Sequence, residues 1–312
     1  MKESVPQETG LQKLFFNFLK PYKFLFLLSV LAVCFSLYQV GTKGFNYGTD
    51  FTGGLEKIVF FSEEEKTSQE VIDVLREYGL QADVEKVLSR ENTFVIRFSL
   101  FETEQEVVEK KFDDFLKEHF PLAEIEQTRL VSGVVSEENK RNAISTSLIV
   151  ILLIVIYLTL RFEFRYALGA LLAVMHDVAI MIGIVALMGL KINVLTMVAV
   201  LTIFGYSVND TIIVFDRIRE LQKDNFSDSF LYTMSYAVRL VFARTLITSL
   251  TTLFVVAALF TSTTDDYKDF AFLLIIGIIS GTFSTIYVAL PFLLIYRNVA
   301  KYAHKFLPQK RS

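Results

Sequence analysis

The sequence predicts a polytopic α-helical membrane protein with six transmembrane helices and a small external α+β domain of the ferredoxin-like kind. Three observations predict this class. The chain of 312 residues is 53% hydrophobic, with a mean hydropathy of +0.45. Six apolar runs each approach the roughly 20 residues that a membrane helix needs. The polar stretch between the first two runs alternates strand and helix patterns.

The six predicted spans are residues 22–40, 144–160, 166–188, 192–215, 240–260 and 270–296. The first run is long for a signal peptide and no small-residue cleavage motif follows it, so we interpret it as an uncleaved anchor. Before it, Leu11, Leu14, Phe15 and Phe18 recur at helical spacing. This spacing predicts a short amphipathic helix lying on the membrane surface.

Lysine and arginine in the short loops predict the orientation of the spans, because these residues gather on the cytoplasmic side. One side has most of them: Lys2, Lys13, Lys20, Arg161, Arg165, Arg217, Arg219, Lys223, Arg239, Arg297, Lys301, Lys305, Lys310 and Arg311. The opposite short loops have only Lys191 and Lys268. We therefore expect a cytoplasmic segment at 1–21, the first span at 22–40, an external domain at 41–141, five spans within 142–298 and a basic cytoplasmic tail at 299–312.

The external segment has the order βαββαβ, which is that of the ferredoxin-like fold. Strands are predicted at 56–62, 82–88, 93–100 and 123–134, and amphipathic helices at 66–79 and 104–118. The inward faces of the two helices are predicted to be Val71, Val74 and Leu75, and then Val107, Val108, Phe112 and Phe115. We interpret the acidic run at 63–65 as a solvated turn rather than a ligand set. The fold by itself indicates little about function.

Composition excludes several classes of function. A net charge of −3 without a basic patch argues against nucleic acid as a partner. The single Cys34 allows no disulfide within the chain, and three scattered histidines, His119, His176 and His304, argue against a histidine metal site. No glycine-rich phosphate loop and no nucleophile–base pattern is present. We expect no metal, no cofactor and no enzymatic activity.

Ionisable residues inside the predicted spans are the candidate functional residues, because each costs at least a few kcal/mol in lipid. Asp177 follows His176 in the third span, Asp210 follows Asn209 in the fourth, and Arg244 lies in the fifth. A rise of about 1.5 Å per residue places both Asp210 and Arg244 roughly 24 Å below the external boundary. The matched depth predicts that these two residues lie close enough to pair.

Two interpretations of such a pair stay open. The pair could be structural and simply hold two helices together. Alternatively it is a proton-responsive site, since low dielectric disfavours a charged carboxylate while a nearby guanidinium favours it. The same two interpretations apply to Asp177 with His176, which is a second candidate proton site. The charges of Asp216, Arg217, Arg219 and Glu220 are interpreted as an ordinary helix exit, and Gly277 with Gly281 as a helix-packing face.

Several motifs together resemble one known family. The external segment opens with the glycine-rich motif Gly48-Thr49-Asp50-Phe51-Thr52-Gly53-Gly54. The third span contains Val174-Met175-His176-Asp177-Val178. The fourth ends in a long motif around Val208-Asn209-Asp210-Thr211, and the fifth contains Ala243-Arg244-Thr245-Leu246. Over essentially the whole chain the sequence resembles the SecF family of protein-export membrane proteins, which belongs to the resistance–nodulation–division superfamily.

The resemblance implies a location in the bacterial inner membrane and a role late in protein export. It implies SecD, the Sec translocon channel, exported preproteins and the lipid bilayer as partners. It also implies that the proton-motive force is used, with Asp210, Arg244 and Asn209 tied to proton passage and a matching aspartate supplied by SecD. Two alternatives stay open: a small-molecule or lipid exporter subunit of the same superfamily, and a non-transporting membrane scaffold. The small external domain argues against the exporter.

Overall fold

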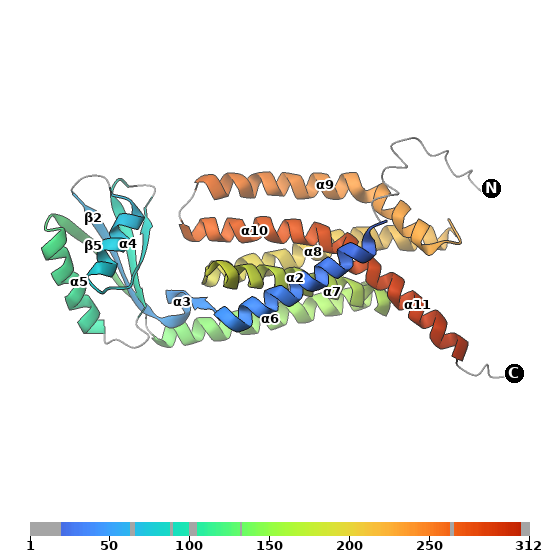
Figure 1. Ribbon diagram of the computed structural model, residues 1–312, viewed down its shortest axis with the longest axis horizontal. Coiled ribbons are helices and arrows are strands. Elements are labelled where there is room, and N and C mark those ends of the chain that lie inside the picture. Colours follow the sequence, from blue (N-terminus) through green and yellow to red (C-terminus); the bar gives the residue numbers. More distant parts are fainter. Residues whose placement is uncertain are drawn as a thin grey trace.

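The computed structural model describes residues 20–62, 66–87, 90–99, 105–131, 133–262 and 265–306. Figure 1 shows an elongated molecule with a small sheet domain at one end and a helical bundle at the other. Within these residues, six helices are long and apolar enough to cross a membrane: Tyr22–Lys43, Ser136–Arg161, Phe164–Met188, Val194–Lys223, Phe230–Thr261 and Tyr267–Val299. The prediction of six spans and a ferredoxin-like external domain is therefore confirmed. The amphipathic helix before residue 20 and the acidic run at 63–65 lie outside the described residues.

The sheet domain has the predicted order of strands and helices. Its elements are β2 (Gly54–Phe61), α4 (Ser68–Glu77), β3 (Asp83–Lys86), β4 (Thr93–Ser99), α5 (Gln105–His119) and β5 (Ala123–Val131). The sheet order is β3-β4-β2-β5, with every neighbouring pair antiparallel. Helix α4 begins at a capping box, in which Thr67 and Glu70 satisfy each other's backbone amides.

The core of the sheet domain corrects one detail of the sequence analysis. Val108, Phe112 and Phe115 of α5 are buried as predicted, but Val107 is 54% exposed. The buried residues recur at i, i+4 and i+7, which defines a single helix face, and Val107 is one position, or about 100°, away from it. Val107 is therefore outside the core although its side chain is apolar.

The membrane bundle is built around α7 (Phe164–Met188), α8 (Val194–Lys223) and α10 (Asp265–Ser284), which all contact one another. Helix α2 (Tyr22–Lys43) packs on α7, and α9 (Phe230–Ser262) packs on α8 and α10. Helix α6 (Gly133–Arg161) lies at the edge, with 6% of its span buried against 72% for the span that contains α10. It begins eleven residues before the predicted span, because its first turns extend into the polar region.

The last span is not a uniform α-helix. A π-helical segment (Thr285–Ala289) joins α10 to α11 (Leu290–Phe306), and all five of its residues are buried. Such segments are rare and are often found at functional sites. Close to it, Gly277 packs directly on α8, because a Cβ there would lie 2.3 Å from Ile203 Cγ1. Gly281 similarly lies against Ser207. The two glycines therefore face α8, and they let α8 and α10 approach closely.

Candidate functional site

Asp177 lies at the centre of the bundle, where α7, α8 and α10 meet. Its side chain is fully buried. Three serine hydroxyls donate hydrogen bonds to it: Ser207 of α8 at 2.6 Å, Ser280 of α10 at 2.6 Å and Ser284 of α10 at 2.8 Å. His176 Nδ1 lies 3.0 Å from Asp177 Oδ1. Both carboxylate oxygens are thus fully engaged, and one side chain ties three helices together.

Sequence reasoning found Asp177 and His176 but missed Ser280 and Ser284. The two serines lie four residues apart, so they share one helix face and point at the same carboxylate. Hydroxyl residues at this spacing in an apolar span are the signal that could have found them, because buried polar groups in a membrane need partners.

Asp210 is also buried, at 2% exposure, but its surroundings are different. Ser249 of α9 donates a long hydrogen bond of 3.4 Å to Oδ2. Among the described residues, no group bonds to Oδ1. Ser249 Oγ is also 3.2 Å from Thr282 Oγ1 of α10. Asp210 therefore points into the contact between α8, α9 and α10 with one oxygen unsatisfied.

The predicted pairing of Asp210 with Arg244 is not present in this structure. Arg244 is exposed on the outside of α9, and no ion pair between the two is found in the described part of the chain. Thr245 and Ser249, four residues apart, form the buried face of α9 at this level. Arg244 lies about 100° around the helix from Thr245, and so it points away from Asp210.

Asn209 is likewise exposed, on the outer face of α8. The neighbouring Tyr206 crosses to α9, where its hydroxyl donates to the Thr248 carbonyl at 2.8 Å and lies 2.9 Å from Thr252 Oγ1. Asn209 and Arg244 are thus polar side chains on the outside of two packed membrane helices. A charge exposed to lipid at this depth is costly unless another group covers it.

Helix α10 lies between the two carboxylates and contributes hydroxyls to both surroundings. Ser280 and Ser284 bind Asp177, while Thr282 contacts Ser249 beside Asp210. At the π-helical segment, Thr285 Oγ1 lies 2.9 Å from Thr211 Oγ1 of α8. A shift of α10 relative to α8 would therefore change the hydrogen bonds of both sites.

The charges at the end of α8 form ion pairs, one of them with Arg161 at the end of α6. Arg161 Nη2 lies 2.5 Å from Asp216 Oδ2, and Arg217 Nη1 lies 2.5 Å from Glu220 Oε2. Arg219 lies 3.9 Å from Asp216. The two shorter pairs involve side chains that are 33–59% exposed, and ion pairs of this kind contribute little to stability.

The glycine-rich motif forms a joint between the sheet domain and the bundle. Its residues lie in and around the short helix α3 (Thr49–Thr52), with Phe51 buried. Asp50 Oδ2 accepts a hydrogen bond of 3.1 Å from the Val194 amide, the first residue of α8. Gly48 donates its amide to the Ile192 carbonyl, and β1 (Asn46–Tyr47) pairs with β6 (Lys191–Ile192).

Steric constraints explain why the last two residues of the motif are glycines. Gly53 has a φ of +76°, a region that favours glycine. A Cβ on Gly54 would lie 2.2 Å from the Phe98 carbonyl oxygen, so β2 could not begin there with another residue. A second link comes from the sheet itself, since Lys191 before α8 forms an ion pair with Asp83 of β3. The beginning of α8 is therefore attached to the sheet domain at several points.

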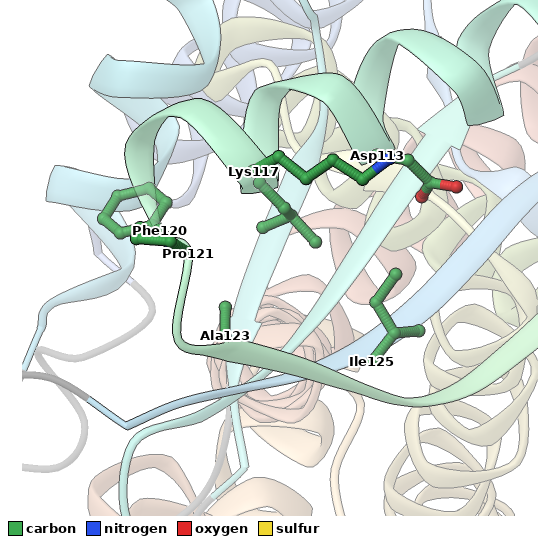
Figure 2. A pocket seen from close by; sticks show the side chains of 7 residues that line it. Asp113, Lys117, Phe120, Pro121, Ala123 and Ile125 are labelled. Atoms are coloured by element: carbon green, nitrogen blue, oxygen red, sulfur yellow. The ribbon is translucent and has the colours of Figure 1, made fainter.

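The sheet domain also has an open hollow between α5 and the edge strand β5. Figure 2 shows the side chains of Asp113, Lys117, Phe120 and Ile125 around it. Asp113 already binds the buried Lys57 at 2.7 Å. The described residues contain no group of three or more histidine, cysteine, aspartate or glutamate side chains that could hold a metal.

Comparison with known proteins gives a consistent result. Residues 111–299 match the model of the family described as protein export membrane protein SecD/SecF, C-terminal. The chain is 35% identical over 284 residues to the protein translocase subunit SecF of Sebaldella termitidis, covering 88% of this chain and 90% of that protein. It is 32% identical to the protein translocase subunit SecDF of Thermus thermophilus, covering 92% of this chain and 39% of the relative.

A solved structure is similar as well. The crystal structure of SecDF from Thermus thermophilus, described as a translocon-associated membrane protein, superposes with a TM-score of 0.75 at 32% identity. The match covers 90% of this chain and 38% of that one. The chain is thus similar to a part of that larger protein.

Proposed function

Because this chain belongs to the SecD/SecF family of protein-export membrane proteins, we propose that it is a multi-pass subunit of a protein translocase that promotes late steps of preprotein export. In this proposal the sheet domain lies on the external side of the bacterial inner membrane and both termini are cytoplasmic. The distribution of lysine and arginine among the short loops supports this orientation.

We further propose that export is driven by the proton-motive force through Asp210. The observation that supports this is a buried carboxylate, deep in the bundle, with one oxygen that has no partner among the described residues. In a membrane interior such a group is a functional-site hypothesis by default. Gain or loss of a proton at Asp210 would change its interaction with Ser249 and thereby the packing of α8 against α9 and α10.

The exposed Arg244 and Asn209 support a partner chain in the membrane. We propose that SecD covers this face of α8 and α9 and supplies an acidic acceptor for Arg244. A similar protein, SecDF of Thermus thermophilus, has a name that joins the two components. The Sec channel and the exported preproteins would complete the assembly. No cofactor and no enzymatic step is part of the proposal.

The joint at the beginning of α8 supports the transmission of movement from the membrane helices to the sheet domain. A displacement of α8 would pull on Asp50, β6 and Lys191, and so move the sheet domain. One charge crossing 100 mV gives about 2.3 kcal/mol. This biases a two-state element by well over tenfold, while a complete switch needs roughly 5.5 kcal/mol. Several protons for each stroke, or a small bias, would therefore be needed.

The test is a pulse-chase of a secreted precursor in cells depleted of this protein. We expect wild type to restore export and Asp210→Asn, at equal abundance, to fail, because the amide cannot exchange a proton at this position. Asp216→Asn is the matched control, since Asp216 lies at the end of the same helix and is 37% exposed. Equal rescue by Asp210→Asn would show that Asp210 is structural, and export that is unaffected by depletion would contradict the role itself.

A further inference from the structure

An apolar cavity of about 550 Å³ lies between α6, α7 and α8, directly beneath the joint. Its walls include Ile151 of α6, Ile182 of α7, and Val200 and Phe204 of α8. The cavity is open on the side of α6, where Ile144 in its lining is 61% exposed. A cavity of this size and lining, within the spanning part of the molecule, therefore suits an apolar chain.

The depth of the cavity corresponds to one leaflet. It extends along α8 from near Val194, at the beginning of the helix, to Phe204. Ten residues of helix rise about 15 Å. The hydrocarbon core of a bilayer is about 30 Å thick, so the cavity extends about half-way across it. It lies in the leaflet on the side of the sheet domain, whichever compartment that side faces.

The mouth of the cavity has the residues that a lipid headgroup favours. Lys140 of α6 lines its outer end together with Phe45 and Tyr47. Aromatic side chains gather at membrane interfaces, and basic residues between helices bind lipid phosphates. Lys140 Nζ lies 2.9 Å from Glu137 Oε1, but Glu137 is 74% exposed, and a pair of this kind is weak. The ammonium group can therefore also bind a phosphate.

We infer that this cavity binds one acyl chain of an anionic glycerophospholipid, with the lipid phosphate on Lys140. The charge of Lys140 and the depth of the cavity select this occupant over a protein segment. Phe51 of the joint also lines the cavity, so the bound chain packs against the residues that connect α8 with the sheet domain. The inference concerns binding by this chain alone and does not depend on its role in export.

The test uses the absence of tryptophan from the sequence. A single Phe204→Trp substitution places a fluorophore against the cavity, and the full chain is reconstituted in phosphatidylglycerol vesicles with brominated acyl chains. Phe254→Trp, at a side chain 69% exposed on α9, gives the quenching expected for direct lipid contact. Phe215→Trp, at a fully buried side chain, gives the quenching expected without lipid contact.

We expect Phe204→Trp to be quenched to an extent close to that of Phe254→Trp, although Phe204 is buried within the protein. Adding Val200→Phe, which places a larger side chain in the part of the cavity next to residue 204, should lower the quenching toward the level of Phe215→Trp. Quenching of Phe204→Trp no greater than that of Phe215→Trp would overturn the inference. Circular dichroism of each variant establishes that the helical bundle has formed.

The headgroup is tested by competition between brominated phosphatidylglycerol and unlabelled phosphatidylcholine. Lys140→Gln should reduce the preference for phosphatidylglycerol about fivefold, which corresponds to one cationic group near the surface. Lys110→Gln, on α5 of the sheet domain, is the matched control and should change nothing. An unchanged preference in Lys140→Gln would overturn the assignment of the phosphate to Lys140.

Discussion

The two buried carboxylates of the bundle have opposite surroundings. Asp177 accepts hydrogen bonds from three serines of two other helices, whereas Asp210, among the described residues, has one long hydrogen bond and one oxygen without a partner. A fully satisfied polar network makes the structure around it rigid, and an incompletely satisfied group does not. Asp177 is therefore suited to hold α7, α8 and α10 together, and Asp210 to respond when the helices shift.

We predict that Asp177→Ala destabilises the bundle by about 2 kcal/mol, since three interhelical hydrogen bonds are lost at about 0.6 kcal/mol each. Unfolding of the purified protein by increasing fractions of dodecyl sulfate measures this. Thr251→Ala is the control, because in the part of the chain that the structure describes the Thr251 hydroxyl bonds only carbonyls of its own helix. A midpoint for Asp177→Ala equal to that of the control would show that the serine contacts do not stabilise the fold.

At the scale of the elements, α8 and α10 approach each other closely at the positions of Gly277 and Gly281. Contact between these helices depends on the absence of a side chain at Gly277, where a Cβ would overlap Ile203 of α8. The same helix then becomes π-helical at 285–289, where Thr285 meets Thr211. The hydroxyls of α10 that reach the two polar sites lie between two such features. The tight contact at Gly277 precedes them in the chain, and the π-helical segment follows them.

We predict that Gly277→Ala costs about 1–3 kcal/mol, because a methyl group is forced into a packed contact. Gly205→Ala is the matched control, since a Cβ at Gly205 meets nothing within 4 Å. The double variant Gly277→Ala with Ile203→Ala should be less unstable than the sum of the single variants, because the smaller residue 203 makes room for the methyl group. Additive losses in dodecyl sulfate unfolding would contradict the proposed overlap.

At the scale of the whole molecule, the sheet domain is attached to the bundle at the beginning of α8 as well as through the chain connections of α2 and α6. Asp50 accepts a hydrogen bond from the first amide of α8, β1 pairs with β6, and Asp83 pairs with Lys191. Figure 1 shows α3 between the two parts of the molecule. The helix that contains Asp210 is thus joined directly to the external domain, without an intervening flexible linker.

We predict that Asp50→Ala weakens this joint, because the Val194 amide loses its acceptor at a cost of about 1 kcal/mol. Hydrogen–deuterium exchange should become faster in the first turn of α8 and in β6. Asp73→Ala is the control, because Asp73 lies on α4 with its side chain 54% exposed. Unchanged exchange at residues 191–196 in Asp50→Ala would show that this hydrogen bond does not hold the joint together.

Much of the architecture could be predicted because it depends on patterns of residues that are close together in the sequence. Apolar runs predict the membrane spans. Segments with the two-residue period of a strand alternate with segments that have the 3.6-residue period of a helix, and this alternation predicts the βαββαβ order. The error at Val107 shows the limit of this reasoning, since an apolar side chain can lie beside a buried face without belonging to it. The early beginning of α6 shows another, because polar residues can continue a helix beyond the membrane.

The sequence alone determined the six spans, the external domain, the joint motif and which charges lie within the membrane, because each depends on residues close together in the chain. Only the tertiary structure decided which side chains meet. Depth along a helix placed Asp210 and Arg244 at one level, but the rotation of each helix about its axis turned Arg244 outward. That rotation also brought Ser207, Ser280 and Ser284 to Asp177. It is determined by the packing of all the helices together, which no local pattern records.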